Sequence, residues 1–201
     1  MGHSAGTSLT TGFGNVIIGR VAGYATTDVD KAVIIGEQAG YTGNMTSAAD
    51  GTVSIGSGAG KNITSGQANV SVGFGALTTE DTGDFNTAIG YQALLSQNRD
   101  GTVNNTAVGY HAGLDVTTGY GLTLIGSLAG HNITEGIENT IIGNSAAASL
   151  TTGDWNTALG VQALATEDVG RGTTAIGYQT LYSQNSDSND EETFNTAVGF
   201  K

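Results

Sequence analysis

The sequence predicts an all-β protein, a parallel β-solenoid (β-roll) of about eleven coils with a repeat of mainly 17 residues. One short phrase recurs along the chain: Asn-Thr-Ala-Ile-Gly-Tyr-Gln-Ala-Leu at 86–94 returns in part at 105–110, 156–160 and 195–200. The glycine of this phrase, here called the marker glycine, recurs at intervals of 17 residues in seven of ten cases. A fixed period this short is typical of a solenoid, in which a single coil cannot bury its own apolar face.

The marker glycines run through the whole chain, so we expect one repeat domain at 15–201, preceded by an N-terminal tail or cap at 1–14. They are Gly19, Gly36, Gly56, Gly73, Gly90, Gly109, Gly126, Gly143, Gly160, Gly177 and Gly199. Glycine makes up 33 of 201 residues, at fixed places in the repeat, which indicates turns and close backbone approach. With neighbouring coils about 4.8 Å apart, eleven coils form a rod of roughly 50 Å.

Each coil is expected to contain one short strand just before its marker glycine. The Val/Thr column comprises Val16, Val33, Val53, Val70, Thr87, Thr106, Thr123, Thr140, Thr157, Thr174 and Thr196, and the aliphatic column comprises Ile18, Ile35, Ile55, Val72, Ile89, Val108, Ile125, Ile142, Leu159, Ile176 and Val198. These residue types favour strands, and the two columns share one face because side chains alternate along a strand.

We expect this shared face to lie inside the coil. The third residue after the marker glycine is Ala in nine coils, with Thr180 as the exception, which indicates a narrow inward slot opposite the aliphatic column. The residue between the two columns, Ile17 in the first coil and Ala197 in the last, is never charged. A strand that is apolar on both faces is normally covered on both, so this second face is expected to pack on another copy of the chain. The alternative is a surface of small residues.

Two more slots predict the corner that leads into the strand. In most 17-residue coils, the fourth residue before the strand is Gly, as at Gly66 and Gly83. The coils that are longer than 17 residues lack this Gly. The slot that immediately precedes the strand, here called the Asn slot, holds Asn15, Asn69, Asn86, Asn105, Asn139, Asn156 and Asn195. Asn forms hydrogen bonds with local backbone in turns, and stacked copies form an Asn column.

The coil is lengthened at 41–51, 95–104 and 182–194, and residues 87–98 closely resemble 174–185. Loops on a rigid scaffold often carry binding residues, and harmless surface insertions are the alternative. The candidate receptor-contact residues in these loops are Asn98, Arg99, Asp100, Asn185, Asp187, Asp190 and Glu191, and the candidate exposed aromatic residues are Tyr91, Tyr110 and Tyr178.

The charge pattern excludes several classes of function. A net charge of −12 with only six basic residues opposes binding to nucleic acid and to anionic membranes.

No signal peptide or membrane span is visible, and we expect no insertion into a membrane. The absence of Cys rules out zinc–thiolate sites, His111 and His131 occupy surface slots, and the acidic run at 187–192 fits a solvated loop better than a Ca²⁺ site. We therefore predict no metal site, no cofactor-binding or catalytic residue, and no cofactor.

The recurring phrase followed by a Thr-Gly turn resembles repeats of phage tail-fibre and tail-spike proteins. It is also similar to the head repeats of trimeric autotransporter adhesins, which have a shorter coil. The resemblance covers residues 15–201. It implies a left-handed β-roll, an intertwined or side-by-side homotrimer, and a role in host-cell attachment. It also implies contacts with other virion tail components and with a polysaccharide or protein receptor on the host. The location implied is the virion, outside the host cell, after synthesis in the host cytoplasm without a signal peptide.

We therefore expect a structural and adhesive fibre segment of a virion. The alternatives are the head fragment of a bacterial trimeric autotransporter adhesin and, from another class, an ice-binding solenoid with a regular Thr column. Exposure of the Thr column would favour the ice-binding alternative. A polysaccharide-cleaving solenoid requires a carboxylate cluster, and no slot repeats Asp or Glu, so we predict that the chain is not an enzyme.

Overall fold

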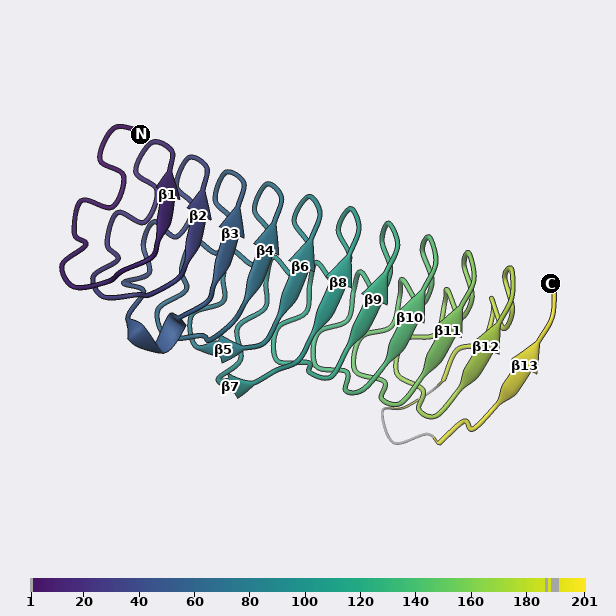
Figure 1. Cartoon of the computed structure of the whole chain (residues 1–201). Helices are drawn as coiled ribbons and strands as arrows, with labels where there is room; N and C mark the ends of the chain where they lie inside the picture. The colour runs from purple at the N-terminus through teal and green to yellow at the C-terminus, as the bar shows by residue number, and fades with distance from the viewer. Residues whose placement is uncertain (1, 187, 189–191) are drawn as a thin grey trace.

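The computed structural model describes residues 2–186, 188 and 192–201, and these residues form a rod of stacked coils with a terminus at each end (Figure 1). One parallel sheet of eleven strands runs along the rod. Its strands are β1 (Val16–Ile18), β2 (Val33–Ile35), β3 (Val53–Ile55), β4 (Val70–Val72), β6 (Thr87–Ile89), β8 (Thr106–Val108), β9 (Thr123–Ile125), β10 (Thr140–Ile142), β11 (Thr157–Leu159), β12 (Thr174–Ile176) and β13 (Thr196–Val198). The predicted all-β parallel β-solenoid is confirmed.

The remaining described elements lie in lengthened coils or, in one case, in the ordinary coil next to one. The short strand β5 (Gly83–Asp84) pairs in parallel with β7 (Gly101–Thr102), and η1 (Ser47–Ala49) is a single 3-10 turn. In the main sheet every strand pairs with the equivalent strand of the next coil, so that Val16 faces Val33 and Thr87 faces Thr106. The insertions therefore lengthen loops without shifting the register of the sheet.

The backbone of each coil turns where φ is positive. In the first ten coils φ is positive at the marker glycine, at the second and fourth residues after it, and at the residue before the Asn slot. At the marker glycines φ lies between 125° and 158°, a region reserved for glycine. A Cβ atom at any of the first ten marker glycines would also overlap the carbonyl oxygen of the next one. The repeat glycine is thus required both by conformation and by the close stacking of coils.

The expectation about which strand face lies inside was wrong. The middle residue of each strand points into the coil and is fully buried in β2, β3, β4, β6, β8, β9, β10, β11 and β12. The Val/Thr and aliphatic columns point outward instead, and Val16, Ile18 and Leu159 are 44%, 48% and 43% exposed. The nine predicted inward Ala residues are fully buried, as expected, but they share the interior with the middle strand residue. A coil this narrow has no room for two branched strand side chains.

Inside the coil, large and small residues compensate for each other. Where the middle strand residue is large, as at Ile34 and Leu124, the fourth residue after the marker glycine is Gly40 or Gly130, and a Cβ atom there would contact Ile34 or Leu124. Ala107 is followed in this slot by Gly113, but in the other three complete coils whose strand residue is Ala the slot holds leucine, which is fully buried in two of them. Such pairs are Ala88 with Leu94 and Ala158 with Leu164. This alternation fills the interior at the close packing usual for protein cores.

The predicted Asn column is present and connects neighbouring coils. In the middle of the rod, Asn139 donates from Nδ2 to the Gly153 carbonyl at 2.8 Å, and its Oδ1 accepts the backbone N–H of Asn156 at 2.8 Å. Asn69, Asn105 and Asn156 make the same two kinds of bond to the following coil. Each Asn is buried and satisfies backbone groups that the corner leaves unpaired.

Candidate functional site

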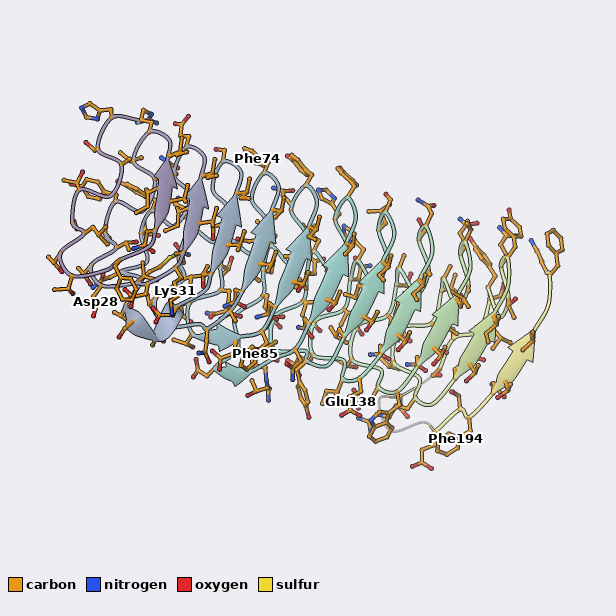
Figure 2. All side chains as sticks on the ribbon, in the orientation of Figure 1. Asp28, Lys31, Phe74, Phe85, Glu138 and Phe194 are labelled. Carbon is orange, nitrogen blue, oxygen red and sulfur yellow. The ribbon has the colours of Figure 1, made fainter. Side chains whose placement is uncertain are left out.

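The outward face of the main sheet is the most extensive apolar surface of the protein. It consists of the Val/Thr column and the aliphatic column, which contain no charged residue in any of the eleven coils. Two flanking columns border it: the residues before the Asn slots, such as Phe85, and the residues after the marker glycines, such as Phe74. Figure 2 shows Phe74 at the upper end of the strands and Phe85, Glu138 and Phe194 along the lower edge. We call these four columns together the apolar side, although the flanking columns also contain the charged residues Arg20, Lys31, Glu37 and Glu138.

Exposed apolar side chains gather on this side. Among the described residues, all exposed large hydrophobic side chains except Phe13 and Tyr24 belong to the apolar side. They are Val16, Ile18, Phe74, Phe85, Ile89, Tyr91, Tyr110, Ile125, Trp155, Leu159, Val161, Tyr178, Phe194, Val198 and Phe200. Apolar patches that extend this far on a soluble protein mark an interaction surface.

Aromatic rings stack along one flank of this side. The ring of Tyr91 lies 5.3 Å from that of Phe74 and 5.6 Å from that of Tyr110, with interplanar angles of 11° and 18°. The His111 ring stacks on Tyr110 at 3.8 Å. The predicted aromatic residues Tyr91 and Tyr110 are thus exposed members of one continuous row.

The third predicted aromatic residue, Tyr178, lies in the same flanking column but in a separate group near the other end of the rod. It is 43% exposed, and its ring stacks on that of Phe200 at 5.1 Å. Ser127, Asn144 and Val161 occupy this slot in the intervening coils. The predicted aromatic residues therefore form two groups on one edge of the apolar side.

The three candidate residues of the first predicted receptor loop, at 95–104, have different surroundings. Asn98 is exposed and lies on a polar groove described below. Arg99 turns away, with its guanidinium 4.2 Å from the centre of the Tyr120 ring and Nη1 donating to the Thr118 carbonyl at 3.3 Å. Asp100 accepts a hydrogen bond from the Thr82 hydroxyl at 2.5 Å. The structure does not bring these three side chains together.

The second predicted receptor loop is described only in part. With its amide oriented to suit its neighbours, Asn185 donates to the Thr166 carbonyl at 2.8 Å and to Asp168 Oδ1 at 3.2 Å. The other candidates, Asp187, Asp190 and Glu191, lie outside the described residues. Asn185 is therefore the one candidate of this loop that the structure places.

Two buried carboxylates hold these loops, and sequence reasoning missed them. Glu80 Oε1 accepts the backbone N–H of Gly83 at 2.7 Å, and Oε2 accepts that of Arg99 in the first loop at 3.4 Å. Glu167, 87 residues later, accepts the N–H of Gly170 at 2.8 Å and that of Ser186 in the second loop at 3.1 Å. Both carboxylates are fully buried.

A sequence signal for these carboxylates existed. The similarity between 87–98 and 174–185 extends backward to Ala-Leu-Thr-Thr-Glu-Asp at 76–81 and Ala-Leu-Ala-Thr-Glu-Asp at 163–168. In both copies Leu fills the interior slot, and three residues later Glu turns inward, where other coils place Ile63 or Ile133. A charged residue in a slot that is otherwise apolar indicates a buried, hydrogen-bonded group.

The two carboxylates are expected to respond to pH in opposite directions. Burial raises the pKa of Glu80 above its ordinary value of 4.5, and the four backbone N–H bonds only partly oppose this rise. Burial also tends to raise the pKa of Glu167, but hydrogen bonds from Gln184, Gly170 and Ser186 outweigh it, so this pKa is lowered. The contribution of Glu80 to stability is thus lost as pH rises from 4.5 through its raised pKa. That of Glu167 is lost as pH falls from 4.5 through its lowered pKa.

We predict that Glu80→Gln and Glu167→Gln will change the pH dependence of stability in opposite senses. As pH rises above 4.5, the stability of wild type against urea should fall relative to that of Glu80→Gln. As pH drops below 4.5, it should fall relative to that of Glu167→Gln. Urea unfolding at a series of pH values between 3 and 7 measures both. The same pH trend in both comparisons would contradict the assignment.

The described residues contain no group of three or more His, Asp or Glu side chains that is arranged to hold a metal ion. In the same part of the chain, no helix is long and apolar enough to cross a membrane. Comparisons of the chain with protein-family models, with curated proteins and with solved structures found no match. The surfaces described above therefore provide the basis for a functional proposal.

Proposed function

We propose that the chain is a structural and adhesive fibre segment of a virion, assembled as a homotrimer through its apolar side. The observation that carries this proposal is the pair of uncharged central columns, which continue through every strand of the main sheet. Burial of apolar surface contributes about 25 cal/mol per Å², so covering this face supplies a large driving force for association.

The repeat itself favours other copies of the chain as the partners on this face. A second copy has the same coil spacing, so its columns meet those of the first coil by coil along the rod. The first four coils present Val beside Ile or Val, and the later coils present Thr beside an aliphatic residue. Most homo-oligomers have closed point-group symmetry, and a three-fold ring, in which each chain meets its two neighbours through different edges of one side, is one of its forms.

The number three, the left-handed coil and the attachment role follow from the resemblance to phage tail-fibre repeats. The same geometry serves the alternative of a trimeric autotransporter adhesin head. In either case the apolar side is covered, and the polar corners and lengthened loops remain outside to meet the host receptor. Other virion tail components are the expected partners at the ends of the rod.

Light scattering on the purified chain tests the assembly. A mass near three times 20.2 kDa is expected. A folded monomer at micromolar concentration would contradict self-association through the apolar side and with it the fibre proposal.

A second candidate function, ice binding, is favoured by one observation. The Thr column faces outward, with Thr140 and Thr196 exposed and the intervening Thr157 and Thr174 half-buried. A regular row of hydroxyls on a flat sheet can order water, but here an aliphatic column lies beside it. Measurable thermal hysteresis of a monomeric sample would support ice binding. A trimeric sample without thermal hysteresis would exclude ice binding.

A further inference from the structure

A shallow groove of about 370 Å³ crosses four adjacent coils away from the apolar side. It is lined by two columns, the sixth and the eighth residues after the marker glycines. The sixth-residue column contributes Thr42, Asn62 and Thr79, and the eighth-residue column contributes Thr64, Asp81 and Asn98. The seventh residue after each marker glycine lies between these two columns and turns inward. At one end of the groove this residue is the buried Gly43.

The backbone under the groove is fixed. The N–H of Thr64 donates to the Asp81 carbonyl at 2.8 Å, and the N–H of Asn98 donates to the carbonyl of Thr117 in the next coil at 2.9 Å. The buried Glu80 accepts the N–H of Asp81 at 3.0 Å from below. The lining side chains are therefore presented on a pre-organised surface, which reduces the entropy lost when a ligand binds.

The side chains that line the groove have hydrogen-bonding capacity left over. In the part of the chain that the structure describes, the side chains of Thr79, Asp81 and Asn98 form no hydrogen bond, although their backbones are paired. A hydroxyl and an amide both donate and accept, and a carboxylate accepts only. The three together offer both kinds of group within two adjacent coils.

The chemistry of the lining selects one class of ligand. The lining contains neither an aromatic ring nor a basic residue, and Asp81 with a net charge of −12 repels anions. One carboxylate is too few for a protein Ca²⁺ site, which takes six to eight oxygen ligands. A neutral molecule with many hydroxyl groups matches these donors and acceptors, because each hydroxyl can donate to a carboxylate or amide oxygen and accept from an amide N–H. We propose that this groove binds a neutral oligosaccharide.

The duplicated part of the chain provides an internal contrast. Asp168 and Asn185 are the equivalents of Asp81 and Asn98 in the 87-residue duplication, and there the two side chains bond to each other at 3.2 Å. Asn185 also donates to the Thr166 carbonyl. The hydrogen-bonding groups that remain free in the first copy are thus committed to one another in the second.

This proposal rests on the adhesive part of the proposed function and specifies its ligand. A groove without an apolar anchor binds a single oligosaccharide weakly, since polar groups exchange water for ligand at little net gain. Three copies in one fibre raise the overall avidity by 10² to 10⁴ without new contacts.

The test is binding of the purified full chain to an array of neutral hexose oligosaccharides, with uronic-acid oligosaccharides as anionic counterparts. Hits are titrated by NMR, and light scattering is run on the same samples. The double variant Asp81→Ala/Asn98→Ala is expected to bind at least tenfold more weakly. The matched control Asp168→Ala/Asn185→Ala, in the equivalent slots, is expected to bind like wild type. Unchanged melting temperatures confirm that both variants fold.

Three results would overturn the proposal: no binding of any neutral oligosaccharide, preference for the anionic ones, or equal losses in both double variants. The proposed function fails separately. If the chain is a monomer that binds neutral oligosaccharides through the groove, the ligand proposal stands and the fibre proposal fails. If it is a trimer that binds none, the fibre proposal stands and the ligand proposal fails.

Discussion

Replacing Gly56 with Ala is expected to destabilise the solenoid by about 3 kcal/mol or more, enough to remove much of the stability of an ordinary domain. Two effects add at this marker glycine. Its φ of 134° belongs to a region that costs an L-residue about 1 to 3 kcal/mol. An added Cβ would also overlap the Gly73 carbonyl oxygen and lie 2.6 Å from its carbonyl carbon, so the next coil must move away. Urea unfolding followed by circular dichroism measures the loss.

Gly58→Ala, two residues later in the same coil, is the matched control. Gly58 also has a positive φ, 69°, but no atom lies within 4 Å of the position its Cβ would occupy. The same slot holds Gln38, Gln92 and Gln162 in other coils. We expect a cost of about 1 kcal/mol from the left-handed conformation alone. Equal losses at Gly56 and Gly58 would show that contact between coils is not what requires the marker glycine.

Much of the fold is predictable from the sequence because the repeat restricts every coil in the same way. The spacing of the marker glycines places all eleven strands of the main sheet, and the Ala slot identifies one wall of the interior. Even the Asn column is visible, because buried Asn residues such as Asn139 bond to the same backbone groups in coil after coil. Regularity is the signal in each case.

The orientation of the strands is not predictable from apolar character alone. Both faces of each strand are uncharged, so the regular column of Ile and Val is easily mistaken for the core. The informative signal is compensation: Ile34 accompanies Gly40, and Ala88 accompanies Leu94, because these pairs share a fixed interior volume. The outward aliphatic column shows no such compensation.

The candidate sites were only partly visible from the sequence. Loop length identified Asn98, and Thr42 also lies in a lengthened segment. Groove residues such as Asn62 and Asp81 lie in ordinary coils and become neighbours of the others only through stacking. Arg99 was a candidate because it lies in a lengthened loop, whereas the structure places its guanidinium over the Tyr120 ring. A single sequence does not reveal which polar side chains are already committed to a partner within the chain.

Replacing Ile125 with Asp is expected to prevent assembly while leaving the coil folded. Ile125 is in the aliphatic column of β9, near the middle of the rod, and is 38% exposed in the single chain. In a homotrimer formed through the apolar side, the substitution places three carboxylates in a desolvated interface, and each carries a penalty of several kcal/mol. We expect the concentration of half-dissociation to rise at least a hundredfold, which for a trimer is a 10⁴-fold change in the dissociation constant and about 5.5 kcal/mol per trimer. Light scattering over a dilution series measures it.

The control for this substitution is Asn132→Asp, which adds the same charge at an exposed residue outside the apolar side. It should remain trimeric, because the charge stays in water in both the free and the assembled chain. Circular dichroism should show both variants folded, since the side chain that fills the core of this coil is the neighbouring Leu124, fully buried and unchanged. If Ile125→Asp assembled like wild type, the partner surface would have to lie on another side of the solenoid, and the outward aliphatic column would have no assigned role.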